Sequence, residues 1–188
     1  MDGARLAELL RALYESEDDR LRREHHRSLP FQDAAFDRWD RARRLGFGEG
    51  TSIYNSAAVF GDVFVGHHTW IGPNTLLDGS GGSLRIGAFC SVSSGVQIFT
   101  HDTVLWALSG GKLPRAEAPV SIGDCCYIGS HSIIASGVTI GNQCVIGANS
   151  YVNHDVADST IAAGSPARRI GLVVGTGPDV RLVFDSKA

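Results

Sequence analysis

His101 is the residue whose type and setting best suit acid–base chemistry in this sequence. It stands in Thr100-His101-Asp102, at the start of a stretch that interrupts a regular pattern of the chain. Histidine titrates near pH 6.5, so close to neutral pH it can take a proton from a reacting hydroxyl or amine. Asp78 and Asp102 are the carboxylates that could orient its ring, although either could instead stabilise a turn. The sequence therefore predicts a catalytic base at His101, with Asp78 or Asp102 as its partner.

The cysteines and the other histidines do not form a metal-ligand pattern. A zinc lyase would need three convergent histidines, two of them close in sequence, whereas the next histidine after His101 is His131. Three of the four cysteines fall on small, inward positions of the repeat described below, where Cys packs as a compact apolar residue: Cys90, Cys126 and Cys144. We therefore expect no metal.

Aliphatic residues recur every six positions over much of the chain. The series comprises Ile53, Val59, Val65, Ile71 and Leu77, then Ile86, Val92 and Ile98, then Ile122, Ile128, Ile134, Ile140, Ile146 and Val152. A glycine often follows the aliphatic residue, and a small or β-branched residue lies four positions after it. Apolar residues recur with a period of 3.6 residues in an amphipathic helix and of two residues in a simple strand. A unit of six with turn-permitting glycine therefore predicts short strands joined by tight corners, stacked on their neighbours.

Successive hexads can be assigned in turn to three faces of a prism, A, B and C, beginning with Ile53 on face A. This assignment puts Ile161 on face C. Three interruptions then fall where the chain passes from face B to face C: extra residues near 79–82, a long excursion at 99–119, and extra residues near 154–158. They should stack along one edge, called edge BC below. Binding groups often occupy loops on a rigid scaffold, so we expect the chemistry on this edge.

The segments outside the repeat predict a domain division of 1–48, 49–170 and 171–188. In the first segment, Leu6, Leu9, Leu10 and Leu13 trace one face of an amphipathic helix, and residues 31–39 suggest a second, short helix. Because the open end of stacked strands needs cover, these helices are predicted to form a cap. The last segment is predicted to form a tail with two short strands on either side of residues 175–178.

The bulk properties exclude several classes of protein. The 188 residues are 43% hydrophobic and carry a formal net charge of −3, without a basic tract, which argues against a nucleic-acid partner. No apolar run approaches the roughly 18 residues of a membrane span, and the start lacks a signal-peptide pattern. We therefore expect one soluble domain without a membrane partner, located in the cytoplasm.

The I-G-x-x-x-x hexads, the histidine at the start of the excursion and the closing A-A-G-S-P-A-R-R-I at 162–170 resemble the hexapeptide-repeat acyltransferases. The likeness is greatest to the galactoside, maltose and xenobiotic acetyltransferases and to sugar acetyltransferases of surface-polysaccharide pathways, and it covers about residues 53–170. It implies an all-β, left-handed parallel β-helix, an exception to the usual right-handed crossover. It also implies a homotrimer that binds acetyl-CoA between subunits, with His101 as the catalytic histidine.

The resemblance further implies a set of acetyl-CoA contacts. The backbone N–H of Ser130 would stabilise the thioester oxygen, Ala148 would lie beside the pantetheine arm, and Arg168, with Arg169 beside it, would contact the phosphates. His154 stands where many relatives have a lysine, and it is a weaker candidate for a ligand contact.

Ser130 and His101 follow different faces in the assignment above. One whole face, very roughly 15–20 Å of strand, would separate their edges. The two groups could therefore meet only across a subunit interface, in agreement with the implied trimer.

Acceptor contacts are predicted in the excursion. Trp106 could stack on a sugar ring, and Lys112 or Arg115 could bind an anionic group such as a nucleotide diphosphate. The excursion could close over the acceptor as a lid, or it could pack on the neighbouring subunit. Galactoside-type relatives place an asparagine one turn before the histidine; the nearest here is Asn74, out of register.

These features predict an acetyl-CoA-dependent O-acetyltransferase that acts on a sugar or nucleotide sugar by direct transfer. N-acetylation of an amino sugar could use the same base and CoA groove and is the near alternative. A non-catalytic solenoid scaffold is a remote alternative, because it gives no reason for an excursion that carries a histidine.

Overall fold

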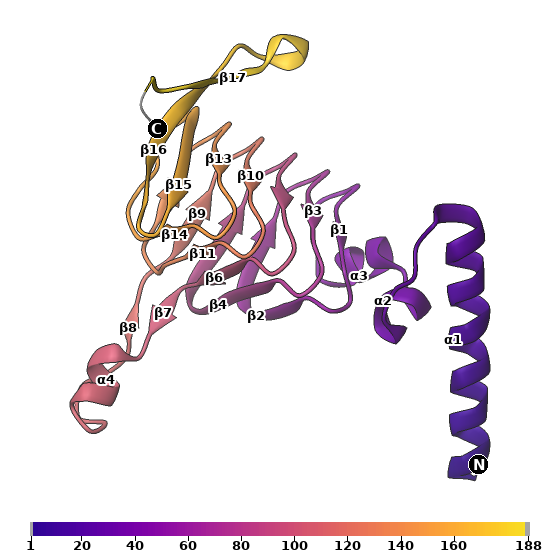
Figure 1. The fold of residues 1–188 in the computed structure, drawn as a ribbon. Coiled ribbons are helices and arrows are strands. Elements are labelled where there is room, and N and C mark those ends of the chain that lie inside the picture. Colours follow the sequence, from indigo (N-terminus) through magenta and orange to yellow (C-terminus); the bar gives the residue numbers. More distant parts are fainter. Residues whose placement is uncertain (1, 187–188) are drawn as a thin grey trace.

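The computed structural model describes residues 2–186 and is built of parallel strands stacked over successive coils of the chain, with helices at one end (Figure 1). The helices are α1 (Gly3–His25), α2 (Phe31–Ala35) and α3 (Arg38–Arg44) before the strands, α4 (Val104–Leu108) in the excursion, and the 3-10 helix η1 (Gly177–Asp179) near the end.

The strands form the three predicted faces. Face A contains β1 (Ser52–Ile53), β3 (Trp70–Ile71), β5 (Ser91–Val92), β10 (Tyr127–Ile128), β13 (Val145–Ile146) and β15 (Thr160–Gly164). Face B contains β6 (Gln97–Phe99), β11 (Ile133–Ile134) and β14 (Tyr151–Val152), and face C contains β9 (Val120–Ile122) and β12 (Thr139–Ile140). The longer strands β2 (Ala58–Val65) and β4 (Leu76–Ile86) run from face B onto face C.

The strand register confirms the face assignment for every hexad through Val152. On face A, Ile53 pairs with Ile71, Ile71 with Val92, Val92 with Ile128, and Ile128 with Ile146, all in parallel. Faces B and C show the same stacking, for example Ile98 beside Ile134 and Ile122 beside Ile140. Each uninterrupted coil thus takes three hexads, one for each face.

The last coil corrects the prediction. Val156, not Ile161, continues face C, because Val156 forms a parallel bridge with Ile140. Ile161 lies on face A, where it pairs with Val145. The step from Val152 on face B to Val156 on face C is therefore two residues shorter than a hexad. The predicted step, from Val152 to Ile161, would have been three residues longer than a hexad. A count in sixes could not detect this shortened corner, since both Val156 and Ile161 are aliphatic.

The inward aliphatic side chains form the core. Those of the hexads are completely or almost completely buried, except that of Val59, which is partly buried. The small residues of the second inward position are buried as well, including Cys90, Cys126 and Cys144. Burying one such Ile or Val side chain contributes about 1.5–3 kcal/mol. The three buried thiols donate in turn to the carbonyls of Gly123, Gly141 and Ala157 in the following coil, so the predicted packing role of these cysteines is confirmed.

The predicted cap is only partly formed. α3 lies against β1, and Ala42 and Phe47 join the buried core at the open end. By contrast, α1 packs on α2, through Tyr14 and Phe31, and its predicted leucine face is exposed. The predicted short helix at 31–39 is split in two, because Phe36 is extended and Asp37 caps α3 by accepting the Asp40 N–H at 2.7 Å.

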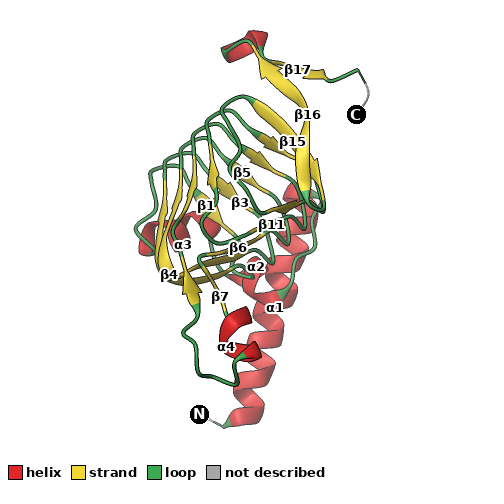
Figure 2. Ribbon diagram, turned by 90° about the vertical axis from the view of Figure 1, so that its left-hand side faces the viewer, coloured by secondary structure: helices red, strands yellow, loops and turns green. Residues whose placement is uncertain are grey.

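Two hairpins leave the coil on opposite sides (Figure 2). The excursion forms β7 (His101–Asp102), paired antiparallel with β8 (Ala116–Glu117), and carries α4 at its tip. The tail forms the predicted strand pair, β16 (Ala167–Val174) with β17 (Arg181–Phe184). Among residues 2–186, no helix is both long and apolar enough to cross a lipid bilayer.

Candidate active site

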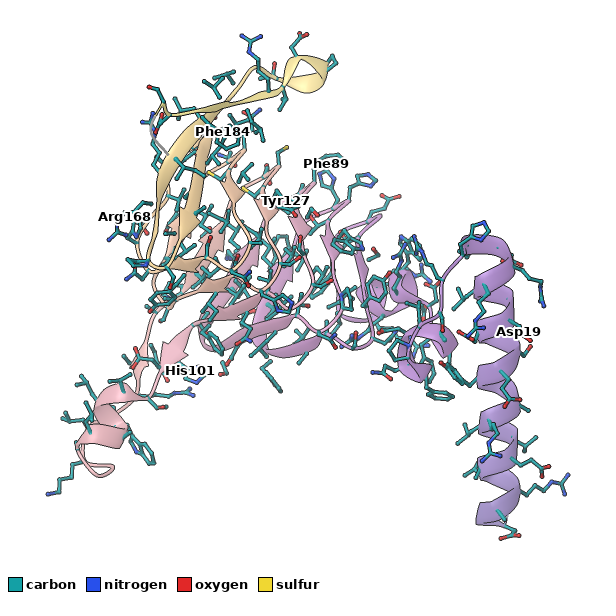
Figure 3. The ribbon with its side chains drawn as sticks, in the orientation of Figure 1. Asp19, Phe89, His101, Tyr127, Arg168 and Phe184 are labelled. Carbon is teal, nitrogen blue, oxygen red and sulfur yellow. The ribbon has the colours of Figure 1, made fainter. Side chains whose placement is uncertain are left out.

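His101 lies at the base of the excursion on edge BC (Figure 3). Its Nδ1 is 3.5 Å from Oδ2 of Asp78, the residue that follows Leu77 on face B. The Asp78 side chain is only 10% exposed and that of His101 21% exposed, so both groups are partly withdrawn from water. The second Asp78 oxygen accepts the Ser80 N–H at 2.9 Å, which fixes the carboxylate beside the ring.

Three residues that were not predicted to belong to the site hold His101 in place. The Ser80 hydroxyl lies 3.4 Å from Nδ1. Buried Thr100 donates its hydroxyl to the Asp78 carbonyl at 2.8 Å and accepts the Gly81 N–H at 2.9 Å. Gly81 lies so close that an added Cβ would come within 2.5 Å of the His101 Cβ. The sequence predicts only an interruption of the repeat at 79–82, whereas the absence of a side chain at Gly81 is what allows this close approach.

Asp102 does not face the imidazole. Its carboxylate accepts the Val104 N–H at 3.0 Å at the beginning of α4, and its side chain is exposed. Of the two predicted partners, the structure therefore brings Asp78 to His101 and leaves Asp102 as a turn residue. The pairing could not be chosen from the sequence, because both carboxylates were compatible with edge BC.

The excursion projects away from the coil instead of lying over it (Figure 1). Arg115 ties the base of the excursion to the 79–82 loop, since it donates to the Ser80 carbonyl at 2.9 Å and to Glu117 at 2.5 Å. Trp106, on α4, is half exposed, and Lys112 is exposed.

Edge AB, between faces A and B, carries a different set of groups, among them Ser130 and Ala148. Within residues 2–186, the N–H of Ser130 donates to no acceptor, and neither does that of Ala148. On edge CA, between faces C and A, three amides at the same position are occupied: Asp124, Asn142 and Asp158 accept, in turn, the N–H of Ala88, Asp124 and Asn142 at 2.6–2.8 Å. The free N–H groups of Ser130 and Ala148 can therefore bind an oxyanion or a carbonyl oxygen on edge AB.

The remaining predicted residues are divided between the two edges. Asn74 lies on edge AB, in a left-handed conformation (φ 57°), one face away from His101. Arg168 and Arg169 lie on β16, where they pair with Ala163 and Ala162 beside the end of the same edge. Arg168 is exposed (Figure 3), whereas Arg169 forms an ion pair with Asp185 at 3.2 Å.

His154 is the predicted residue that lies on edge BC near the end of the coil. It is exposed, and its Nδ1 is 3.1 Å from the Asn153 amide oxygen. Among the described residues, no group of three His, Cys, Asp or Glu side chains is arranged to hold a metal ion.

Comparison with known proteins agrees with this architecture. Residues 119–154 match the family model described as the hexapeptide repeat of succinyl-transferase. Protein CapG of Staphylococcus aureus is 45% identical over 89 residues. Residues 119–154 of this chain are thus similar to a hexapeptide-repeat family. The predicted resemblance of the chain to the hexapeptide-repeat acyltransferases is confirmed.

The CapG match covers 46% of this chain and 51% of CapG, so the chain spans about half the length of this curated relative. A hexapeptide-repeat acetyltransferase of Vibrio cholerae, VCA0836, solved with acetyl-CoA, is 26% identical, with a TM-score of 0.53 over 85% of this chain and 86% of that one. AntD, an N-acyltransferase of Bacillus cereus solved with dTDP and coenzyme A, is 24% identical, with a TM-score of 0.59 over 71% of this chain and 88% of that one. At this identity the likeness to AntD concerns the fold alone.

Proposed function

We propose that this protein is an acetyl-CoA-dependent O-acetyltransferase that acts on a sugar or nucleotide sugar. The observation that carries the proposal is the His101–Asp78 pair, because a partly buried carboxylate 3.5 Å from Nδ1 leaves Nε2 available as a base. Acetyl-CoA is bound by VCA0836, which shares 26% of its residues with this chain, and we assign the same acyl donor here. We also infer the left-handed coil that is typical of these relatives.

In the proposed reaction, Nε2 of His101 takes the proton of an acceptor hydroxyl as its oxygen attacks the thioester carbonyl. The carbonyl oxygen becomes negative and receives a hydrogen bond from the Ser130 N–H. The C–S bond then breaks, and the departing CoA thiolate takes the proton back from the imidazolium. Asp78 keeps the ring oriented and stabilises its positive charge during the transfer.

His101 and Ser130 lie on different edges of one chain, so the proposed site needs two copies. We infer a homotrimer in which edge BC of one subunit faces edge AB of the next. Arg168 and the Ala148 backbone would then bind the phosphates and the pantetheine arm along edge AB. The free amides of Ser130 and Ala148 support this orientation, since the equivalent amides of Ala88, Asp124 and Asn142 on edge CA are already occupied.

A mixing experiment tests the reaction and the shared site together. His101→Ala removes the base, and Ser130→Pro removes the amide donor, so each variant alone should be inactive. If the site is shared, unfolding and refolding the two variants together should restore part of the wild-type acetyl-CoA turnover. Mixed trimers would contain some sites with both an intact histidine and an intact amide. Turnover by His101→Ala alone at the wild-type rate would refute the proposal.

The acceptor class is tested by product analysis with matched sugars that carry a hydroxyl or an amino group at the same carbon. O-acetylation predicts an ester product that alkaline hydroxylamine cleaves. An amide product, stable to hydroxylamine, would replace the O-acetyl assignment by N-acetylation on the same scaffold.

A further inference from the structure

A cleft of about 510 Å³ lies between α1 and the segment formed by α2 and α3. Its floor includes Tyr54 and Asn55, which form the edge AB corner of the first coil. This corner is attached to the helices through the Asn55 amide, which donates to the Phe36 carbonyl at 2.9 Å, and through Asp33, which accepts the Ser56 N–H at 2.9 Å. The cleft therefore belongs to the same edge as Ser130.

The cleft is lined by an aromatic–guanidinium cluster. The Arg38 guanidinium lies 4.1 Å from the ring centroid of Trp39 and 5.2 Å from that of Tyr54, and it donates to the Tyr54 hydroxyl at 3.1 Å. Trp39 is 43% exposed. An exposed aromatic face beside a fixed guanidinium suits a sugar ring that carries an anionic group.

Two arginine side chains of the cleft form no ion pair within the described part of the chain. Within residues 2–186, neither Arg38 nor Arg27 forms an ion pair with a carboxylate. The carboxylates that line the cleft already have partners inside the chain: Glu17 pairs with Arg20, Asp33 accepts the Ser56 N–H, and Asp37 accepts the Asp40 N–H. The guanidinium groups of Arg38 and Arg27 are therefore available to an anionic ligand.

The position of the cleft relates it to the proposed reaction. The cleft lies on the first coil, and face A of that coil is three strand steps from β10, which precedes Ser130. At about 4.8 Å for each step, the separation along edge AB is roughly 14 Å. Arg168, the proposed phosphate contact, lies beyond Ser130 in the opposite direction. A donor bound between Ser130 and Arg168 thus leaves the first coils of edge AB free for the acceptor.

We propose that this cleft binds the distal part of an extended, anionic sugar acceptor, with one ring against Trp39 and its anionic group on Arg38 and Arg27. The inference rests on the proposed function, because it names the part of the acceptor that does not react. A single pyranose does not span 14 Å, so the acceptor must extend by at least a second sugar or a diphosphate. Carboxylated oligosaccharides and nucleotide sugars share this chemistry.

The test measures binding by calorimetry on the full chain, so that it does not depend on turnover. The probes are sialyllactose, compared with lactose, and dTDP-glucose, compared with glucose. The two members of each pair differ by the anionic part. The first pair tests a carboxylated oligosaccharide as the ligand, and the second pair tests a nucleotide sugar. We expect at least one anionic probe to bind, its neutral counterpart to bind much more weakly, and Arg38→Gln or Trp39→Ala to weaken binding roughly 10- to 100-fold. Arg5→Gln removes an arginine outside the cleft and should change nothing.

Arg27→Gln provides a second test in case Arg38→Gln does not fold. It should not disturb the fold, because Arg27 is exposed and makes no side-chain hydrogen bond within the described residues. Equal affinity in wild type, Arg38→Gln and Arg27→Gln would overturn the inference, as would the absence of binding by both anionic probes. If His101→Ala abolishes acetyl transfer while the cleft variants bind as wild type does, only the cleft inference fails. If the cleft binds but no acetyl transfer occurs with any acceptor, the proposed function fails instead.

Discussion

Replacing Asp78 by Asn removes the charge beside His101 and leaves the shape of the side chain. The carboxamide can still accept the Ser80 N–H, so the local fold should persist. At the observed 3.5 Å, a carboxylate–imidazolium pair is worth about 1 kcal/mol in bulk water and about 5 kcal/mol at the effective dielectric of a protein surface. The exposed fractions of 21% and 10% place this pair between these limits, near 3 kcal/mol. The proton transfer should then slow by about 100-fold.

The assay is chromatographic measurement of CoA release with the acceptor that gives the fastest wild-type rate. We expect kcat to fall about 100-fold with little change in KM for acetyl-CoA, because the lost interaction acts on the charged imidazolium. Asp102→Asn is the matched control, since that carboxylate contacts Val104 and not the ring; its kcat should stay within about threefold of wild type. The reasoning is refuted if Asp78→Asn stays within threefold as well, or if Asp102→Asn is equally slow.

Three further outcomes are expected. Gly81→Ala should lower kcat by about 100-fold, because the new Cβ would displace His101, whereas Gly3→Ala, where nothing lies within 4 Å, should have no effect on kcat; equal rates would exclude this close packing. A maleimide should label only Cys125 in the native protein and all four cysteines after denaturation, and mass spectrometry would reveal any other count. Burial, with a smaller contribution from Asp124, raises the pKa of the Cys125 thiol, so labelling should accelerate only at higher pH than for a free cysteine, and it should be faster in Asp124→Asn. Ile140→Ala should lower the free energy of unfolding by about 2–5 kcal/mol, measured with urea, and the neighbouring outward Thr139→Ala by less than about 1 kcal/mol; similar losses would contradict the inward and outward assignment.

The hexad period allowed the core and the strand stacking to be predicted, because one aliphatic residue in six points inward and a shift by one residue would expose it. The prediction of Ile161 on face C was wrong, because the corner between Val152 and Val156 is shorter than a hexad and a fixed count carries the error onward.

The support of His101 could not be predicted for a different reason. Ser80 and Gly81 reach His101 through a loop that bulges out of β4, and neither residue type indicates such a contact by itself. The amphipathic pattern at Leu6–Leu13 predicted a helix correctly. It could not show that α1 would leave these leucines uncovered, since periodicity identifies an apolar face but not what covers it.

The extra segments of the coil leave it at edge BC, where β4 and the hairpin of β7 and β8 depart from the regular stacking. The core side chains above and below these departures keep their partners, as the pairing of Ile98 with Ile134 across the excursion shows. Segments of different length can therefore be exchanged at this position without repacking the interior. An engineer who wished to change the acceptor of such a protein could graft a foreign hairpin between Asp102 and Ala116, which pair one position beyond His101, and so keep both the proposed base and the acyl-donor side.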